Sequence, residues 1–253
     1  MSPAKKRKGV SRVADVPAEV LRELEAGTAE TATLAEALAI DFNTLLARVL
    51  DTDDVEPVPA TLGITRRMAL AAERVQNHLG HDAVARCQTH PSDTVRGWGA
   101  YVVASHGTRS LRQQLTAIRP FADDAHFAVR EWAWLALRPQ LAAELDAALT
   151  LLLPWARARS ANVRRFASEA LRPRGVWCSH IGALKDKPGL AGPLLDTLRA
   201  DPSRYVQDSV GNWLNDAYKS QPDWVAARCA AWTADSDTDA TRYIVKRALR
   251  NAR

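Results

Sequence analysis

Apolar side chains recur at helical spacing along most of the chain, and the pattern itself repeats. A Val-Arg pair opens three similar segments at Val95, Val129 and Val163, and related segments start at Val206 and Thr241. Within each segment the apolar residues stand three and four positions apart, which is typical of an amphipathic helix and not of a strand. Ser, Asp, Asn or Pro precede each segment, as expected of helix N-caps.

Further helices are predicted between these segments, over residues 141–155 and 190–200. Two helices in each repeat of roughly 34 to 43 residues indicate an all-α solenoid of HEAT or armadillo type. In such a fold the helix pairs stack, and their second helices line a concave face. We predict that this concave face is basic.

The first 60 residues follow a different pattern. Helices are predicted from about residue 16 to Ala26 and over 31–50, followed by an acidic linker with prolines at 51–59 and a helix at 65–79. We interpret residues 1–10 as a flexible basic tail and 11–253 as a single domain. Within that domain, residues 11–60 are expected to form an N-terminal helical cap, and 61–253 the repeats.

The composition excludes several classes of protein. With 253 residues, 47% hydrophobic and 25% charged, the chain has the balance of an ordinary globular protein. No apolar run approaches the roughly 18–20 residues of a membrane span, and no secretory signal is visible. Cys87, Cys178 and Cys229 form no CxxC pair. We therefore expect a cytoplasmic protein of the bacterial cytosol or nucleoid, without membrane, metal or cofactor.

The basic excess lies in the C-terminal part of the chain. The net charge is +5, yet residues 155–253 alone hold 17 Lys and Arg against 10 Asp and Glu. Such a region, with Trp and Tyr interspersed, fits a polyanionic partner. A basic surface that serves only solubility fits equally well.

Arginine recurs at two positions of the repeat, counted from the aligned valine. Position +1 holds Arg96, Arg130, Arg164 and Arg242, and position +9 holds Arg138, Arg172 and Arg250. We interpret the +1 arginines mainly as partners of an Asp in the preceding turn. The +9 arginines, with Arg165 and Arg174 beside them, are interpreted as phosphate contacts.

Two acids interrupt this basic surface. Glu169 and Asp216 are expected to project from adjacent helices into one stretch of the concave face. Arg172, Arg174, Trp177, Trp213 and Lys219 are expected near them. Two interpretations remain open: the acids form salt bridges to the arginines, or they have a local chemical role.

Two runs of residues carry a resemblance to a known family. Residues 163–174 (VRRFASEALRPR), followed by Trp177, and residues 205–216 (YVQDSVGNWLND), followed by Lys219, resemble motifs of the AlkC branch of the AlkC/AlkD-like DNA alkylation repair family. Residues 34–46 and 241–250 are also similar to it. The resemblance covers roughly residues 30–250 and is sharp over 123–222.

The resemblance implies a HEAT-like-repeat DNA glycosylase, acting as a monomer on double-stranded DNA that contains alkylated bases. Such enzymes excise cationic N-alkylated bases of the 3-methyladenine type without a cofactor. By motif match, Glu169 and Asp216 are the catalytic acids and Trp177 the aromatic beside the lesion. The DNA-binding residues are expected to be Arg130, Arg164, Arg165, Arg172, Arg174, Lys219, Lys246 and Arg247.

One position departs from the family pattern. Where the AlkC-like motif has another acid, this chain has His126, and the nearest carboxylate is Glu131. Two other functions therefore stay open. One is a non-catalytic HEAT-repeat protein that binds damaged, bent or branched DNA, and the other is a scaffold that binds an acidic protein.

Overall fold

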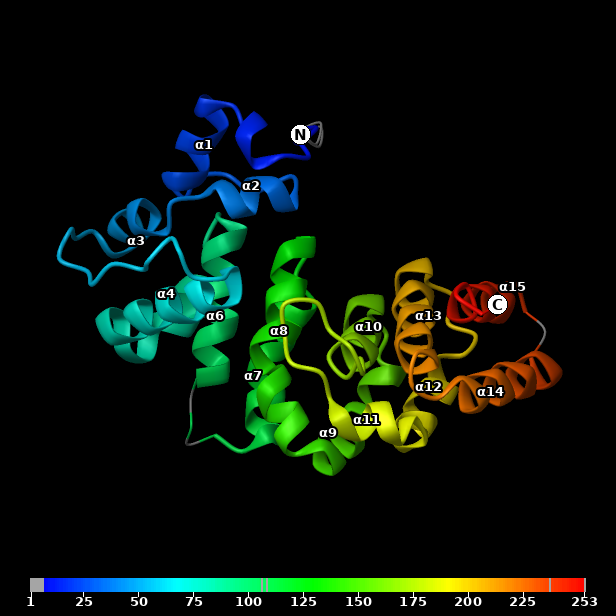
Figure 1. The fold of residues 1–253 in the computed structure, drawn as a ribbon. Helices are drawn as coiled ribbons and strands as arrows, with labels where there is room; N and C mark the ends of the chain where they lie inside the picture. The colour runs from blue at the N-terminus through cyan, green and yellow to red at the C-terminus, as the bar shows by residue number, and fades with distance from the viewer. Residues whose placement is uncertain (1–6, 106, 108, 237, 253) are drawn as a thin grey trace. The chain divides into compact units, whose positions relative to one another are not determined.

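The computed structural model describes residues 7–105, 107, 109–236 and 238–252. Every regular element in these ranges is an α-helix or a 3-10 helix (Figure 1), which confirms the all-α prediction. None of the helices in the same ranges is long and apolar enough to cross a membrane.

The helices group into two compact units, each described by itself. Unit 1 comprises Met1–Thr108 and Asp124–Ala136, and unit 2 comprises Arg109–Asp123 and Leu137–Arg253. The α-helices of the first part of the chain are α1 Ala18–Glu25, α2 Leu34–Ala39, α3 Phe42–Leu50, α4 Ile64–Leu79, α5 Ala83–Gln88, α6 Asp93–Ser105, α7 Leu111–Ala122 and α8 Phe127–Ala143. Those that follow are α9 Leu145–Leu152, α10 Ala161–Glu169, α11 Gly182–Asp186, α12 Gly192–Leu198, α13 Arg204–Tyr218, α14 Pro222–Asp235 and α15 Asp239–Ala248.

The repeat predicted from the sequence is present. Helices α6, α8, α10, α13 and α15 each begin two residues before the aligned Val or Thr. Polar residues cap two of them: Ser160 accepts a hydrogen bond from the backbone of Asn162 in α10, and Thr238 accepts one from Thr241 in α15. Ser203, in front of α13, forms no such side-chain hydrogen bond. The helix starts are therefore confirmed.

The single helix predicted over residues 31–50 is wrong, because the chain forms α2 and α3 there. Ile40 is extended between them, and the Asp41 side chain accepts hydrogen bonds from the backbone of Asn43 and Thr44. A local cap of this kind starts a new helix even within an apolar pattern that would continue the old one.

The helix predicted over 141–155 is also wrong. Helix α8 continues through Pro139 to Ala143, and α9 is a separate helix. A proline inside a helix costs a hydrogen bond, and here the fully buried Leu137 and Leu141 lie on either side of it. Their burial offsets that cost.

The tail predicted over residues 1–10 is anchored at Arg7. Its guanidinium forms two hydrogen bonds of 2.6 Å with the buried carboxylate of Glu36. The prediction of a free tail is therefore wrong for Arg7, while Lys5 and Lys6 lie outside the described residues.

Aromatic side chains fill the core of each unit. In unit 1, Phe42 packs edge-on against Trp98 with ring centroids 5.5 Å apart. Trp132 and Trp134 are buried as well and pack within this core. In unit 2, the buried Trp213 donates a 2.8 Å hydrogen bond to the carbonyl of Leu171.

Gly97 allows α6 to pack closely against this core. A Cβ atom at residue 97 would lie 2.6 Å from Trp132 Cδ1 and 2.8 Å from Met68 Cε. Gly97→Ala should therefore lower the free energy of unfolding by about 1–3 kcal/mol through overpacking. Gly182→Ala is the matched control, because nothing lies within 4 Å of its Cβ position. Urea titrations followed by circular dichroism measure both, and equal stability of the two variants would contradict the prediction.

Candidate functional site

In unit 2, a single guanidinium joins the two acids that the sequence analysis singled out. Arg172 follows α10, and its Nη1 donates to Glu169 Oε1 while its Nε donates to Asp216 Oδ2, both at 2.8 Å. Glu169 ends α10 and Asp216 lies on α13, and these helices pack together. Both carboxylates are buried. The structure thus brings the two acids together, as the sequence predicted.

Both oxygens of Glu169 are engaged. Oε2 accepts a 2.7 Å hydrogen bond from Ser209 and lies 3.7 Å from Arg165 Nη2. Burial alone would raise the pKa of Glu169, but the charges of Arg165 and Arg172 and the hydrogen bonds from Arg172 and Ser209 outweigh it. The pKa therefore lies below its ordinary value, and Glu169 is an ionised, fully paired carboxylate at neutral pH.

Asp216 is engaged through one oxygen. Arg172 holds Oδ2, whereas Oδ1 lies 3.7 Å from the ammonium nitrogen of Lys219. Among the residues described by the structure, none donates a hydrogen bond to Oδ1. This oxygen retains the capacity to accept a hydrogen bond from a water molecule or a ligand.

The segment after Arg172 carries the third predicted residue. Trp177 lies in the loop between α10 and α11, where its side chain is 47% exposed, and the neighbouring Val176 is 62% exposed. The φ angle of Trp177 is +61°, in the left-handed region that residues other than glycine rarely adopt. Two exposed large apolar side chains on such a loop are typical of a contact surface.

The basic residues predicted to bind DNA have different surroundings. Arg174 donates to Ser220 Oγ at 2.6 Å, Arg165 stacks over the Tyr205 ring at 4.4 Å, and Arg247 donates to Asn212 at 3.1 Å. Lys219 is half exposed and Lys246 is exposed. With Arg172, these side chains lie on or directly after α10, α13 and α15 of unit 2.

Arg130 and Arg164 belong to a structural motif of the repeat. In each, Nη1 donates to two backbone carbonyls five and six residues earlier, and Arg96 does the same in α6. Arg164 also binds Asp201, with Nε 2.6 Å from Oδ2, and Arg96 binds Asp124 at 2.9 Å. For Arg96 and Arg164 the expected pairing with an Asp is present, but the prediction of the preceding turn is wrong. Asp124 and Asp201 lie in the turns before α8 and α13, and the preceding turns are bound through their carbonyls.

Arg138 corrects the interpretation of the +9 position. Its side chain is 2% exposed and donates to the carbonyls of Ala170, Arg172 and Ser179. A phosphate contact is therefore wrong for Arg138. A run of neighbouring apolar residues from Trp132 to Leu137 was the available signal that this arginine is buried.

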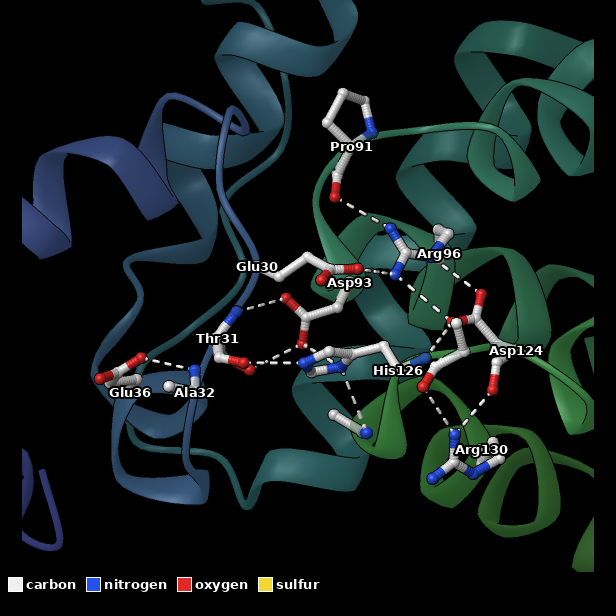
Figure 2. Close-up of polar contacts among 12 residues, drawn as sticks. Glu30, Thr31, Ala32, Glu36, Pro91, Asp93, Arg96, Asp124, His126 and Arg130 are labelled. Carbon is white, nitrogen blue, oxygen red and sulfur yellow. Dashed lines mark hydrogen bonds and ion pairs between the residues drawn. The ribbon is translucent and has the colours of Figure 1, made fainter. Parts of the chain in front are cut away.

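In unit 1, the position of the missing family acid belongs to a buried polar cluster (Figure 2). His126 Nε2 lies 2.7 Å from the carbonyl oxygen of Thr31, and Nδ1 lies 3.3 Å from Asp93 Oδ2. Asp93 accepts hydrogen bonds from the backbone nitrogen and the hydroxyl of Thr31, at 2.9 and 2.7 Å. Burial raises the pKa of Asp93. The sequence analysis missed Asp93, whose carboxyl group fastens the N-terminal segment to α6.

Neither Glu131 nor the rest of the cluster offers a free carboxylate. Glu131 accepts a 2.7 Å hydrogen bond from the indole of Trp134. Glu30 and Asp124 both bind the guanidinium of Arg96. Within the described ranges, no three His, Cys, Asp or Glu side chains are grouped as ligands of a metal ion would be.

Comparison with known proteins places these features in context. No protein-family model matches the chain. Over 148 residues it is 32% identical to the uncharacterized protein YhaZ of Bacillus subtilis strain 168, a match that covers 58% of this chain and 39% of YhaZ. The fold is similar to that of Pseudomonas fluorescens alkylpurine DNA glycosylase AlkC bound to DNA containing an abasic site analog. The TM-score is 0.66 with 26% identity, covering 92% of this chain and 62% of AlkC.

A second solved structure has the same architecture. AlkD2 from Streptococcus mutans matches with a TM-score of 0.62 and 21% identity, over 83% of this chain and 98% of AlkD2. The chain therefore spans less than two thirds of YhaZ and of AlkC, and most of AlkD2. Its helical-repeat fold is similar to the folds of AlkC and AlkD2, as its motifs indicated.

The depressed pKa of Glu169 predicts an acid-sensitive contribution to stability. Glu169→Gln should lower the free energy of unfolding by about 3 kcal/mol at neutral pH, because it breaks a buried ion pair. The native pKa lies below that of the unfolded chain, so the wild-type advantage is fully present above about pH 4.3. It should shrink as the pH falls through the native pKa.

Thermal and urea unfolding between neutral and acid pH measure this difference. Glu144→Gln is the control, because this carboxylate is exposed and forms no side-chain cap hydrogen bond. The pH dependence of its stability should equal that of the wild type. A difference between wild type and Glu169→Gln that persists undiminished at acid pH would contradict the assignment.

Proposed function

We propose that this protein is a DNA glycosylase that excises cationic N-alkylated bases of the 3-methyladenine type from duplex DNA. The observation that carries this proposal is the pair of buried carboxylates joined by Arg172, directly before a loop that exposes Trp177. The likeness to AlkC, a structure that contains DNA with an abasic site analog, supports it.

The chemistry of the lesion fits this arrangement. An N3-alkylated purine is already cationic, so its glycosidic bond can break without protonation of the base. The enzyme must then stabilise an oxocarbenium-like sugar and position a water molecule. The unbonded Oδ1 of Asp216 is suited to both tasks, so Asp216 is proposed as the catalytic acid. No metal or organic cofactor is required by this route.

Glu169 and Trp177 have different proposed roles. Because Glu169 has both oxygens engaged, it acts through Arg172 as a positioning residue that holds the guanidinium against Asp216. The exposed indole of Trp177 offers a π face to the cationic base or sugar, an attraction of about 0.5–2 kcal/mol.

The DNA backbone is proposed to contact the exposed cations of unit 2. Among the described residues, Lys219 has a single carboxylate nearby, that of Asp216 at 3.7 Å, and Lys246 forms no ion pair with a carboxylate. Arg165 and Arg247 lie on α10 and α15, Arg172 and Arg174 lie in the loop after α10, and all four add positive potential. Arg130 and Arg164 are proposed to contact the DNA backbone more weakly, because their guanidinium groups already donate to carbonyls of the preceding turn.

We propose that the protein acts as a cytoplasmic monomer.

One observation favours a second function. Arg172 binds both carboxylates as a structural ion pair would, and the site then needs no reaction to explain it. A non-catalytic HEAT-repeat protein that binds damaged, bent or branched DNA is therefore the alternative.

Release of free methylated base from alkylated duplex DNA by the purified protein tests the proposal. Asp216→Asn should lower the single-turnover excision rate by about 10²-fold or more, the scale of losing one preorganised electrostatic partner. Duplex affinity should hold or rise, because a charge that repels phosphate is removed. Asp223→Asn, at an exposed position in the first turn of α14, is the matched control with wild-type excision. Absence of excision by the wild type would favour the binding protein instead.

Substitution of the exposed lysines tests the DNA contact separately. The double variant Lys219→Ala/Lys246→Ala should bind unmodified duplex more weakly, with a salt slope shallower by roughly 0.9 for each lost phosphate contact. Lys185→Ala/Lys187→Ala, at two lysines outside the proposed set, removes the same two charges and is the control. Fluorescence anisotropy at several salt concentrations measures the slope, and a slope equal to that of the wild type would assign these lysines to solvent.

A further inference from the structure

One buried arginine fastens both ends of the loop that carries Trp177. Arg138 lies on α8, and its Nη1 donates to the carbonyl of Ala170 at 2.8 Å. Its Nη2 donates to Arg172 at 2.6 Å and to Ser179 at 3.1 Å, and Nε reaches Ser179 at 3.3 Å. The three carbonyls stand before and after Trp177 in the chain. The guanidinium therefore closes the loop as a clamp.

The chemistry of Arg138 indicates a task beyond packing. Among the described residues it forms no ion pair with a carboxylate, and burial lowers its pKa. A buried charge without a countercharge is costly unless its donors are all used. Here the guanidinium of Arg138 donates to backbone carbonyls of one loop. The fold bears the free-energy cost of burying its positive charge. The planar guanidinium spreads its donors over three nitrogens, so that it reaches carbonyls too far apart for the single nitrogen of a lysine.

The loop is shaped to fit over this guanidinium. A Cβ atom at Gly175 would lie 3.5 Å from Arg138 Cζ and Nε, and only 2.1 Å from Cys178 Sγ. Residue 175 must therefore lack a side chain. The backbone nitrogen of Ile181 donates to the carbonyl of Pro173 at 3.1 Å and completes the closure. Between these contacts the chain turns so that Val176 and Trp177 are exposed.

We propose that Arg138 is a positioning residue, which holds Val176 and Trp177 in a preformed protruding conformation for contact with the damaged nucleotide. The proposal rests on the proposed glycosylase function and adds a residue to it. Ordering a loop on binding costs conformational entropy, about 1–2 kcal/mol for each residue fixed. A clamp that fixes the loop before DNA arrives removes that cost from the binding step.

Arg138→Lys is the direct test, because lysine keeps the charge but cannot bridge three carbonyls. Hydrogen exchange of the amides in residues 172–181 should accelerate by at least about 10-fold as the loop opens locally. Excision should fall by on the order of 10²-fold, the effect of a misplaced contact residue. Arg96→Lys is the matched control: it also removes a clamp of turn carbonyls, but in unit 1, and should leave exchange in 172–181 unchanged.

A second pair of variants separates loop position from loss of stability. Gly175→Ala should displace the loop through the collision with Cys178 Sγ, and its exchange and excision should resemble those of Arg138→Lys. In Gly175→Ala/Cys178→Ala the collision is removed, so both measurements should return toward the wild type. Cys178→Ala alone should behave as the wild type does.

The two proposals fail in different ways. If the wild type excises no base, the glycosylase function is wrong, and affinity for duplex containing an abasic-site analogue replaces excision as the readout of loop position. The clamp is overturned if Arg138→Lys leaves exchange in 172–181 unchanged. It is also overturned if the loop opens while excision and affinity both stay at the wild-type level.

Discussion

The ion pairs of Arg172 are the interaction on which the candidate site depends. Two buried carboxylates on adjacent helices would repel each other, and each would lose its hydration. A single guanidinium between Glu169 and Asp216 removes both problems with 2.8 Å contacts. The same residue begins the Trp177 loop, and its carbonyl is one that Arg138 holds. One short segment therefore positions both the two acids and the exposed side chain of Trp177. A shift of Arg172 would move both.

Arginine in this chain serves mainly to hold backbone carbonyls and buried acids. Arg96, Arg130 and Arg164 bind the turn before their own helix, and Arg138 binds a loop that starts 32 residues later in the chain. The basic excess of residues 155–253 therefore overstates the positive charge available to a polyanion. Much of it is neutralised or used within the fold, as in the pair of Arg164 with Asp201. The cations best placed for phosphate are the exposed lysines, which lack the fork needed to clamp carbonyls.

Periodicity predicted the start of each repeat helix, because caps and apolar spacing are local properties of the sequence. It also predicted that Glu169 and Asp216 lie together, since repeat positions +6 and +10 share one helical face and stacked repeats are neighbours. The prediction failed where a side-chain cap, or a contact between residues far apart in the sequence, determines the structure. The Asp41 cap divides one apolar pattern into two helices, and Pro139 is tolerated within a buried helix. The contact of Asp93 with Thr31, 62 residues earlier, has no local signal. The burial of Arg138 has only an indirect one, the apolar run of residues 132–137 before it.

Whether the site performs chemistry depends on Asp216 Oδ1, the one oxygen of the two carboxylates that accepts no hydrogen bond from the described residues. A purely structural cluster gains most when each carboxylate oxygen is paired, as Glu169 is through Arg172 and Ser209. Asp216 departs from this arrangement, since Oδ1 has only the 3.7 Å contact with the half-exposed Lys219. An incomplete pairing beside a strained, clamped loop with an exposed indole costs stability without improving the core. That pattern is expected where a second molecule completes the contacts. For a cationic lesion, the missing partner of Asp216 is the developing positive charge of the sugar.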